Sequence, residues 1–312
     1  MLPTRAPGVR CLIINGKTPR RSWLPVDNLD LELPSGVVAG FVGPNGAGKT
    51  TTMAMLLGLV RPTAGSGTVL GGSIAEPAAY LHRVGALIES PAFYPALSGT
   101  ENLRVFATVA GHPTAAIPEL LDLVGLDGRG DDRYRSYSRG MKQRLGIAAT
   151  LLGDPELLIL DEPANGLDPQ GVQDMRSLIG RLAGTGRTVL ESSHDLSELE
   201  QVCDWLVLLD TGRSLYQGPT RALLDGVVAG LAVVPEHAED LPELRDLLVA
   251  DDHQVVLQDD RLVVQDAATG IDSVAAAINR AAFASGMVLV ELSPLRTTLE
   301  DRYLAMVHGT AP

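Results

Sequence analysis

Residues 43–50 read Gly43-Pro44-Asn45-Gly46-Ala47-Gly48-Lys49-Thr50, a complete G-x-x-x-x-G-K-[ST] loop. An apolar run, 37–42, precedes the loop, and a helix-forming run, 51–59, begins at Thr51 directly after it. In loops of this kind the glycines let backbone N–H groups turn toward phosphate oxygens, the lysine reaches the β- and γ-phosphates, and the hydroxyl is placed to bind Mg²⁺. The order of strand, loop and helix therefore predicts a site for a nucleoside triphosphate and Mg²⁺.

The composition is that of a globular protein with about two domains, since 45% of the 312 residues are hydrophobic. The formal net charge of −13 argues against a nucleic-acid partner, which requires clustered Lys and Arg. Cys11 and Cys203 are too few and too far apart for a disulfide framework or a metal site, and indicate buried thiols in a reducing compartment. No apolar run approaches the ~18 to 20 residues of a membrane span, and 11–14 is too short for an export signal. We therefore expect a cytoplasmic protein that reaches a membrane only through another chain.

Strand-like runs alternate with helical patterns over residues 1–220, which is typical of an α/β fold with a parallel sheet. The run 157–160 is apolar on both faces, so we expect it in the middle of the sheet, with the acids that follow it at the ligand edge. The other expected strands are 11–14, 29–33, 37–42, 84–89, 188–192 and 206–210, and the expected helices after 51–59 are 100–110, 116–124, 140–153 and 171–184.

A turn-rich stretch, 211–219, ends this pattern and predicts a second domain over residues 221–312. The runs in it alternate as strand, helix, strand, strand, helix and strand, at 231–234, 241–249, 254–258, 262–266, 271–285 and 288–292. Ile271, Val274, Ala275 and Ile278 form the apolar stripe of a helix that covers one face of a sheet. The βαββαβ order predicts a small α+β, ferredoxin-like accessory domain.

Two adjacent acids, Asp161 and Glu162, follow the apolar run 157–160. Neighbouring residues at a strand end have room for two tasks: Asp161 holds Mg²⁺ through water, and Glu162 polarises the attacking water as a general base. Together with the phosphate loop, this pair predicts hydrolysis of the nucleotide.

Beyond the phosphate loop and the two acids, the chain has three further motifs in the order in which they occur in the ABC-type ATPases, and it resembles that family. Residues 137–144, Tyr-Ser-Arg-Gly-Met-Lys-Gln-Arg, are similar to the signature of that family but depart from Leu-Ser-Gly-Gly-Gln at Tyr137, Arg139 and Met141. Ser138 and Gly140 are kept, and the resemblance implies that they hold the γ-phosphate of ATP bound to a partner subunit, at the positive end of a helix.

Two more positions carry the resemblance further along the chain. Asp168, in Gly166-Leu167-Asp168, resembles the loop that crosses the dimer interface of these ATPases. His194, in Ser192-Ser193-His194-Asp195, resembles the histidine that contacts the γ-phosphate, and it follows an expected strand. The resemblance therefore implies a nucleotide contact for Asp168 and a catalytic role for His194 beside Glu162.

Glu89 stands where the family usually has a glutamine that binds Mg²⁺ and contacts the membrane subunit. A carboxylate ligates Mg²⁺ at least as well as an amide does, so the implied metal-site residues are Thr50, Glu89 and Asp161. The runs 89–95 and 99–103 resemble the bacterial exporters of bacitracin-type and lantibiotic peptides, in which Glu takes this place. The tail 293–304 resembles the ending of drug and antibiotic exporter ATPases.

The adenine-stacking position departs from the family, which has an aromatic residue about 20 to 30 positions before the phosphate loop. Ungapped alignment places Arg20 there. Trp23 is the nearest aromatic residue, and either side chain is able to lie over adenine, Trp23 by stacking and Arg20 as a cation. The sequence leaves the two alternatives open.

The resemblance implies a P-loop NTPase core of the ABC ATPase type over residues 1–220, with a helical subdomain at about 90–155. It implies ATP and Mg²⁺ as cofactors, and ATP hydrolysis that powers export of a drug, an antibiotic peptide or a similar substrate. Because each ATP in this family lies between two such domains, one domain per chain implies a dimer with a second copy. A separate transmembrane permease would hold this dimer on the inner face of the cell membrane.

The alternative is a soluble ATPase of the same superfamily that is not coupled to transport. Members that act on nucleic acid or ribosomes resemble two fused cores with basic linkers, or one core split by a long coiled coil. Only 86 residues, positions 51 to 136, lie between Thr50 and Tyr137, and the chain is acidic. Both features favour the exporter subunit.

Overall fold

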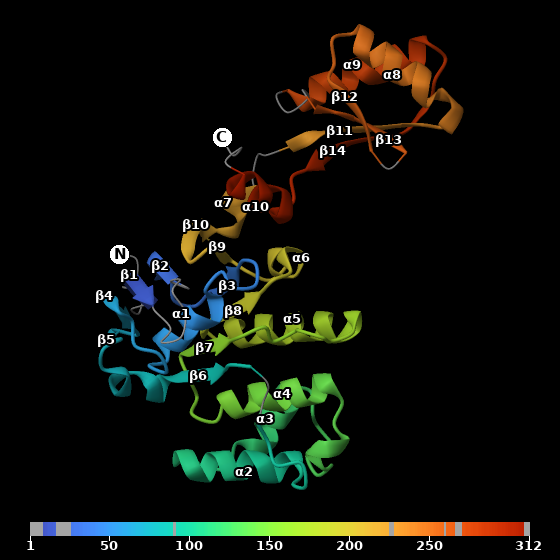
Figure 1. Ribbon diagram of the computed structural model, residues 1–312. Helices are drawn as coiled ribbons and strands as arrows, with labels where there is room; N and C mark the ends of the chain where they lie inside the picture. Colours follow the sequence, from blue (N-terminus) through green and yellow to red (C-terminus); the bar gives the residue numbers. More distant parts are fainter. Residues whose placement is uncertain are drawn as a thin grey trace, which may run out of the picture. The chain divides into compact units, whose positions relative to one another are not determined.

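The computed structural model describes residues 9–16, 26–89, 92–224, 228–258, 260–265 and 270–308 (Figure 1). The chain divides after Thr220 into two compact units, and the last described residues, from Met306, group with the first unit. We describe each unit separately.

A sheet with the strand order β10-β9-β3-β8-β7-β6 forms the centre of the first unit. Strands β9, β3, β8, β7 and β6 are parallel, and β10 pairs with β9 in the antiparallel direction. Every residue of β3, β7 and β8 is buried, as expected for strands that are covered on both faces. The strands are β3 (Val38–Val42), β6 (Val84–Leu87), β7 (Leu157–Leu160), β8 (Thr188–Ser193), β9 (Trp205–Asp210) and β10 (Arg213–Pro219).

A second, antiparallel sheet of this unit has the order β2-β1-β4-β5. Its strands are β1 (Val9–Gly16), β2 (Val26–Leu33), β4 (Ala64–Val69) and β5 (Gly72–Ser73). Leu29, Leu31 and Leu33 of β2 share one apolar core with Phe41 of β3 and with helix α1 (Lys49–Leu56). The helix that follows the phosphate loop is thus fixed by packing between two sheets.

Three helices, α2 (Gly99–Ala110), α3 (Ile117–Leu123) and α4 (Arg139–Thr150), contact one another and form a group beyond β6 (Figure 1). Ser98 begins α2 with a complete capping box, in which its side chain and that of Glu101 each accept a backbone N–H of the other residue. The remaining helices of the unit are α5 (Pro169–Gly184) and α6 (Leu196–Glu200), and α7 (Thr220–Leu224) begins at the unit's last residue before the division.

The second unit is a four-stranded antiparallel sheet with the order β12-β13-β11-β14. Helices α8 and α9 cover one face of this sheet (Figure 1). The elements are β11 (Val228–Pro235), α8 (Leu241–Ala250), β12 (Val255–Gln258), β13 (Arg261–Val264), α9 (Ile271–Ala284), β14 (Leu289–Arg296) and α10 (Leu299–Val307). The stripe from Ile271 to Ile278 packs on the core of this sheet, as its spacing predicted.

The structure confirms the parallel α/β core and the βαββαβ order of the second unit. Strands β4, β5 and β10 and helices α6, α7 and α10 were not expected. Residues 64–69 read Ala-Gly-Ser-Gly-Thr-Val, which has no apolar alternation, and they form a strand because they pair with β1. The expected helix over 51–59 begins at Lys49 and ends at Leu56, two residues before Gly58 turns the backbone at φ 69°. Among the described helices, none has the length and apolar character needed to cross a membrane.

Candidate functional site

The phosphate loop runs from the end of β3 to the first residue of α1, at the edge where the parallel strands end. Gly43 leaves room for the carbonyl oxygen of Leu209, which a Cβ atom at this position would meet, and Gly48 adopts φ 101° before the helix begins. Pro44, Asn45, Gly46, Thr50, Thr51 and other loop residues line an open pocket of about 130 Å³, which Glu162 also borders. The loop that the sequence predicted to bind a nucleoside triphosphate therefore lines an open pocket.

Lys49 is buried beneath this loop, with 6% of its surface exposed. Its Nζ donates to the carbonyl oxygens of Gly43, at 2.6 Å, and Pro44, at 3.4 Å. Burial lowers the pKa of Lys49, and the nearby charges of Glu162 and Asp161 oppose that shift. The ammonium group is therefore held inside the loop with carboxylates close by.

Asp161 joins the loop to the neighbouring strands. Its Oδ2 accepts from the hydroxyl of Thr50 at 2.8 Å, and its Oδ1 accepts from the hydroxyl of Ser192 at 2.5 Å. A hydroxyl and a carboxylate side by side are hard oxygen ligands, which suit Mg²⁺. The pair therefore fits the metal that the sequence predicted.

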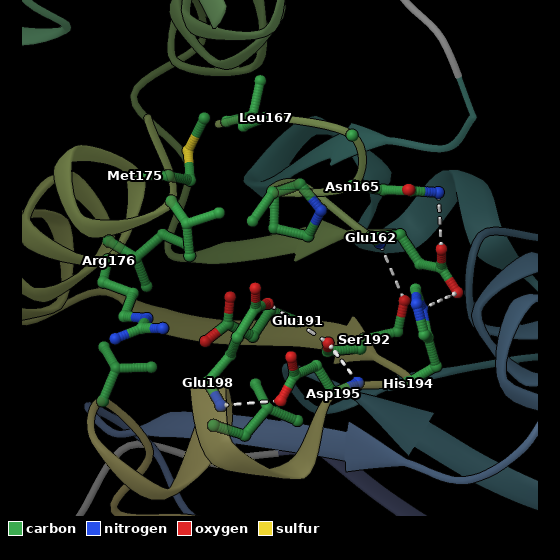
Figure 2. Close-up of a pocket in the computed structure, with 18 residues that line it drawn as sticks. Glu162, Asn165, Leu167, Met175, Arg176, Glu191, Ser192, His194, Asp195 and Glu198 are labelled. Carbon is green, nitrogen blue, oxygen red and sulfur yellow. Dashed lines mark hydrogen bonds and ion pairs between the residues drawn. The ribbon is translucent and has the colours of Figure 1, made fainter. Parts of the chain in front are cut away.

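Glu162 follows Asp161 in a left-handed conformation, φ 47°, which turns its side chain toward the pocket in Figure 2. Its N–H donates to the Ser192 hydroxyl at 2.9 Å. Its carboxylate accepts from the Asn165 amide at 2.9 Å and lies 3.4 Å from Nδ1 of His194. Glu162 and His194, predicted as the catalytic pair, are therefore in contact.

Sequence reasoning did not identify Ser192 and Asn165 as site residues. The hydroxyl of Ser192 bonds to both acids, and the amide of Asn165 holds the carboxylate of Glu162. The sequence contains one indication of the role of Ser192. This serine is the next-to-last residue of a buried strand, and a buried hydroxyl requires a hydrogen-bond partner.

Ser138, Gly140 and Asp168 lie elsewhere on the surface of the same unit. Ser138 is the N-cap of α4 and accepts from the N–H of Met141 at 3.2 Å, and Asp168 is the N-cap of α5 and accepts from the N–H of Gly171 at 2.9 Å. Ser138 and Asp168 are exposed, and Gly140 is half-buried. Within the described part of the chain, none of the three borders the phosphate-loop pocket.

Glu89 comes shortly after β6, is exposed and has φ 60°. It borders an open pocket of about 330 Å³ together with Arg139, Asp161 and Glu162. Among the described residues no three His, Cys, Asp or Glu side chains come close enough to hold a metal, so Glu89 shares a pocket with Asp161 without completing a metal cluster. Trp23 and Arg20, the two alternatives for adenine stacking, lie outside the described residues.

A third pocket, of about 120 Å³, lies behind Glu162 and His194 and contains the buried carboxyl of Glu191 (Figure 2). Glu191 is 4% exposed, and its described partner is the thiol of Cys203, with Sγ 3.6 Å from Oε1. Burial raises the pKa of Glu191 to about 7, against the hydrogen bond from Cys203. Cys203 is a free, buried thiol, as expected, whereas the side chain of Cys11 is outside the described residues.

Changing Glu191 to Gln should make the stability of the protein less sensitive to pH. The unfolded carboxyl ionises near its ordinary value of 4.5, while the folded carboxyl stays neutral up to about 7. The stabilisation that the neutral carboxyl of Glu191 contributes is therefore fully present below the unfolded-state pKa of 4.5, and it is lost as the pH rises through the folded-state pKa of about 7. Between about pH 5 and pH 8 the free energy of unfolding of Glu191→Gln should rise relative to the original protein by about 2 kcal/mol. Urea unfolding followed by tryptophan fluorescence measures this difference, and a difference that is constant with pH contradicts it.

Comparison with known proteins agrees with this geometry. A family model described as "ABC transporter" matches residues 26–165. The chain is 46% identical over 197 residues to the bacitracin transport ATP-binding protein BcrA of Bacillus licheniformis, a match that covers 62% of this chain and 64% of BcrA, just under two thirds of its length. It is 40% identical over 228 residues to the Nod factor export ATP-binding protein I of Cupriavidus metallidurans, covering 72% of this chain and 75% of that protein.

Among solved structures, the ATP-binding subunit of an ABC transporter superposes with a TM-score of 0.61 at 29% identity, covering 69% of this chain and 91% of the other. The fold, the two acids beside the phosphate loop and these matches agree with one another. The chain therefore belongs to the family of ABC transporter ATP-binding proteins.

Proposed function

We propose that this chain is the ATP-binding and ATP-hydrolysing subunit of an ABC exporter, which moves a drug, an antibiotic peptide or a similar substrate through a separate membrane subunit. The placement of Thr50, Asp161 and Glu162 at one end of the phosphate loop carries the proposal. BcrA and the Nod factor protein, whose names specify bacitracin transport and Nod factor export, support the transport role.

Each residue at the site has a task in this proposal. The backbone N–H groups of the loop bind the phosphates, and Lys49 exchanges its present carbonyl partners for phosphate oxygens. Thr50 and Asp161 hold Mg²⁺, which supplies charge neutralisation on the phosphates when it is bound. Glu162 accepts the proton of the attacking water, and His194 and Asn165 hold its carboxylate toward the substrate.

Glu162→Gln should lower ATP turnover by about 10²-fold or more, because the amide keeps the shape of the side chain but does not accept the proton. ATP binding should persist, and the ATP-bound dimer should become more stable because its ligand is no longer consumed. Phosphate release, nucleotide binding and size-exclusion chromatography measure the three effects. Turnover near that of the original protein in a pure preparation would remove Glu162 from this role.

A second copy of the chain is the partner that completes the ATP site in this proposal. Ser138 stands at the N-terminal end of α4, where backbone N–H groups and the positive end of the helix dipole face outward. Its hydroxyl and the neighbouring Gly140 are accessible to the γ-phosphate of ATP held by the other copy, and Asp168 at the start of α5 lies on the same dimer face. The two sites of such a dimer are each built from both chains.

Mixing two inactive variants tests this arrangement. Lys49→Ala removes the phosphate-binding lysine, and Ser138→Arg blocks the signature. In a mixed dimer one composite site is intact and the other is doubly damaged, so we expect the mixture to regain activity that neither variant has alone. Mixed-dimer formation is checked with two affinity tags, and no gain of phosphate release in verified mixed dimers contradicts action across the interface.

An apolar pocket of about 420 Å³ supports docking of the membrane subunit to this unit. Residues of β6, α2 and α4 line it, including Leu87, Phe106 and Ala149, together with Phe93. Phe106 is 38% exposed and nearby Val109 is 84% exposed, an arrangement that leaves apolar surface to be covered. A permease bound here would hold the ATPase on the cytoplasmic face of the membrane, next to Glu89. Copurification of a membrane protein of about six spans would favour this role over the soluble ATPase alternative.

Glu89→Gln should affect transport more than ATP hydrolysis. The substitution keeps one ligating oxygen and removes a charge at the segment between the phosphate site and α2. We expect basal hydrolysis to change by less than about tenfold and transport to fall further. Both rates are measured in vesicles reconstituted with the permease. Equal losses in both would make Glu89 an ordinary catalytic ligand, and no loss in either would make it a bystander.

A further inference from the structure

The imidazole of His194 is not held in place by packing. Its side chain is 53% exposed, and in the described part of the chain its closest polar contact is the carboxylate of Glu162, at 3.4 Å, while it also interacts by charge with Asp195 and Glu198. The orientation of the ring toward Glu162 therefore depends on the backbone of the segment that carries it, residues 193–195.

Glu198 of α6 contacts both neighbours of this histidine. Its carboxyl Oε2 accepts from the hydroxyl of Ser193 at 3.4 Å, and its backbone N–H donates to Oδ1 of Asp195 at 3.3 Å. The N–H of Asp195 donates in turn to the Ser193 hydroxyl at 2.9 Å. These three hydrogen bonds join Ser193, Asp195 and Glu198 in a closed ring, and His194 lies between the first two in the sequence.

The pocket of about 120 Å³ lies on the other side of this ring (Figure 2). A segment that borders a pocket has fewer protein atoms packed on that side, so its polar contacts contribute more to its position. Arg176 borders the same pocket, and among the described residues its buried Nε has no hydrogen-bond partner, while its Nη1 donates to Gln201 at 2.6 Å. Burial, and then the charge of Asp195, raise the pKa of Glu198, and the positive charge of Arg176 opposes them.

We propose that Glu198 is a positioning residue that acts through His194: its carboxyl and its N–H hold Ser193 and Asp195, so that the imidazole faces Glu162. This role goes beyond the family's site residues and rests on the proposed ATPase function. Arg176 provides the counter-charge that lets a carboxylate remain in this half-buried position.

Two substitutions of the same kind in the same pocket separate positioning from a general effect on the fold. Glu198→Met and Glu191→Met each replace a carboxyl group that borders the pocket with a thioether of similar length, which is only a weak hydrogen-bond acceptor, but only Glu198 contacts the neighbours of His194. In protein labelled with ¹³C-histidine, the His194 ring signal is assigned as the one missing from His194→Ala. We expect Glu198→Met to shift or broaden this signal and Glu191→Met to leave it in place. An unchanged signal in Glu198→Met, or an equal change in both variants, overturns the proposal.

Kinetics provide the second readout. Glu198→Met should lower kcat for ATP by about 3- to 10-fold, the range expected for loss of one positioning hydrogen bond, with KM within about twofold. In the His194→Ala background the same substitution should cause no further loss, because its effect passes through the histidine. Losses that multiply in the double variant overturn the proposal. The original protein belongs in the same series, because ATP turnover no higher than background in that protein refutes the ATPase function itself, while the histidine signal still decides the positioning role.

Discussion

Asp161 connects three elements that are far apart in the sequence. Its carboxylate accepts from Thr50 in the first turn of α1 and from Ser192 in β8, and its backbone N–H donates to the carbonyl oxygen of Leu87 at the end of β6. At 8% exposure, a carboxylate without such partners would carry a large desolvation penalty. This requirement for donors fixes the phosphate loop relative to the strand ends, and Ser192, which donates to Asp161, also accepts from the N–H of Glu162.

Strand β8 serves the site from both of its faces. Successive side chains of a strand point to opposite faces, so Ser192 turns toward the two acids while Glu191 and Ser193 turn toward the pocket in Figure 2. The next residue, His194, leaves the strand and returns to Glu162. A single strand end thus links Asp161, Glu162 and the segment that carries His194.

Ser138 and Asp168, which we propose to contact ATP bound to a second copy, each accept a hydrogen bond from the first turn of their own helix. Ser138 and Asp168 each cap a helix, at the start of α4 and α5, and both remain exposed. An N-cap side chain that accepts a single N–H leaves other N–H groups of the first turn without intrahelical partners, so the helix end is able to bind an anion as well. Their fold-stabilising role and their proposed role toward a second copy are therefore compatible.

The sequence by itself determined the phosphate loop, the acids Asp161 and Glu162, the parallel core and the βαββαβ order of the second unit. These features are local. A glycine-rich loop, an apolar strand or an apolar stripe at helical spacing is recognisable from a window of about ten consecutive residues. The weakly patterned strand β4 was missed because its formation depends on pairing with β1.

The tertiary structure alone decided which side chains meet. Ser192 lies about thirty positions from Asp161, and Glu198 shares a pocket with Arg176 of a different helix, because parallel strand ends and the helices after them converge on one edge. No local pattern marks a serine as the partner of two acids, or a glutamate as the support of a histidine. Such roles depend on distances between segments that only the packed sheet brings together.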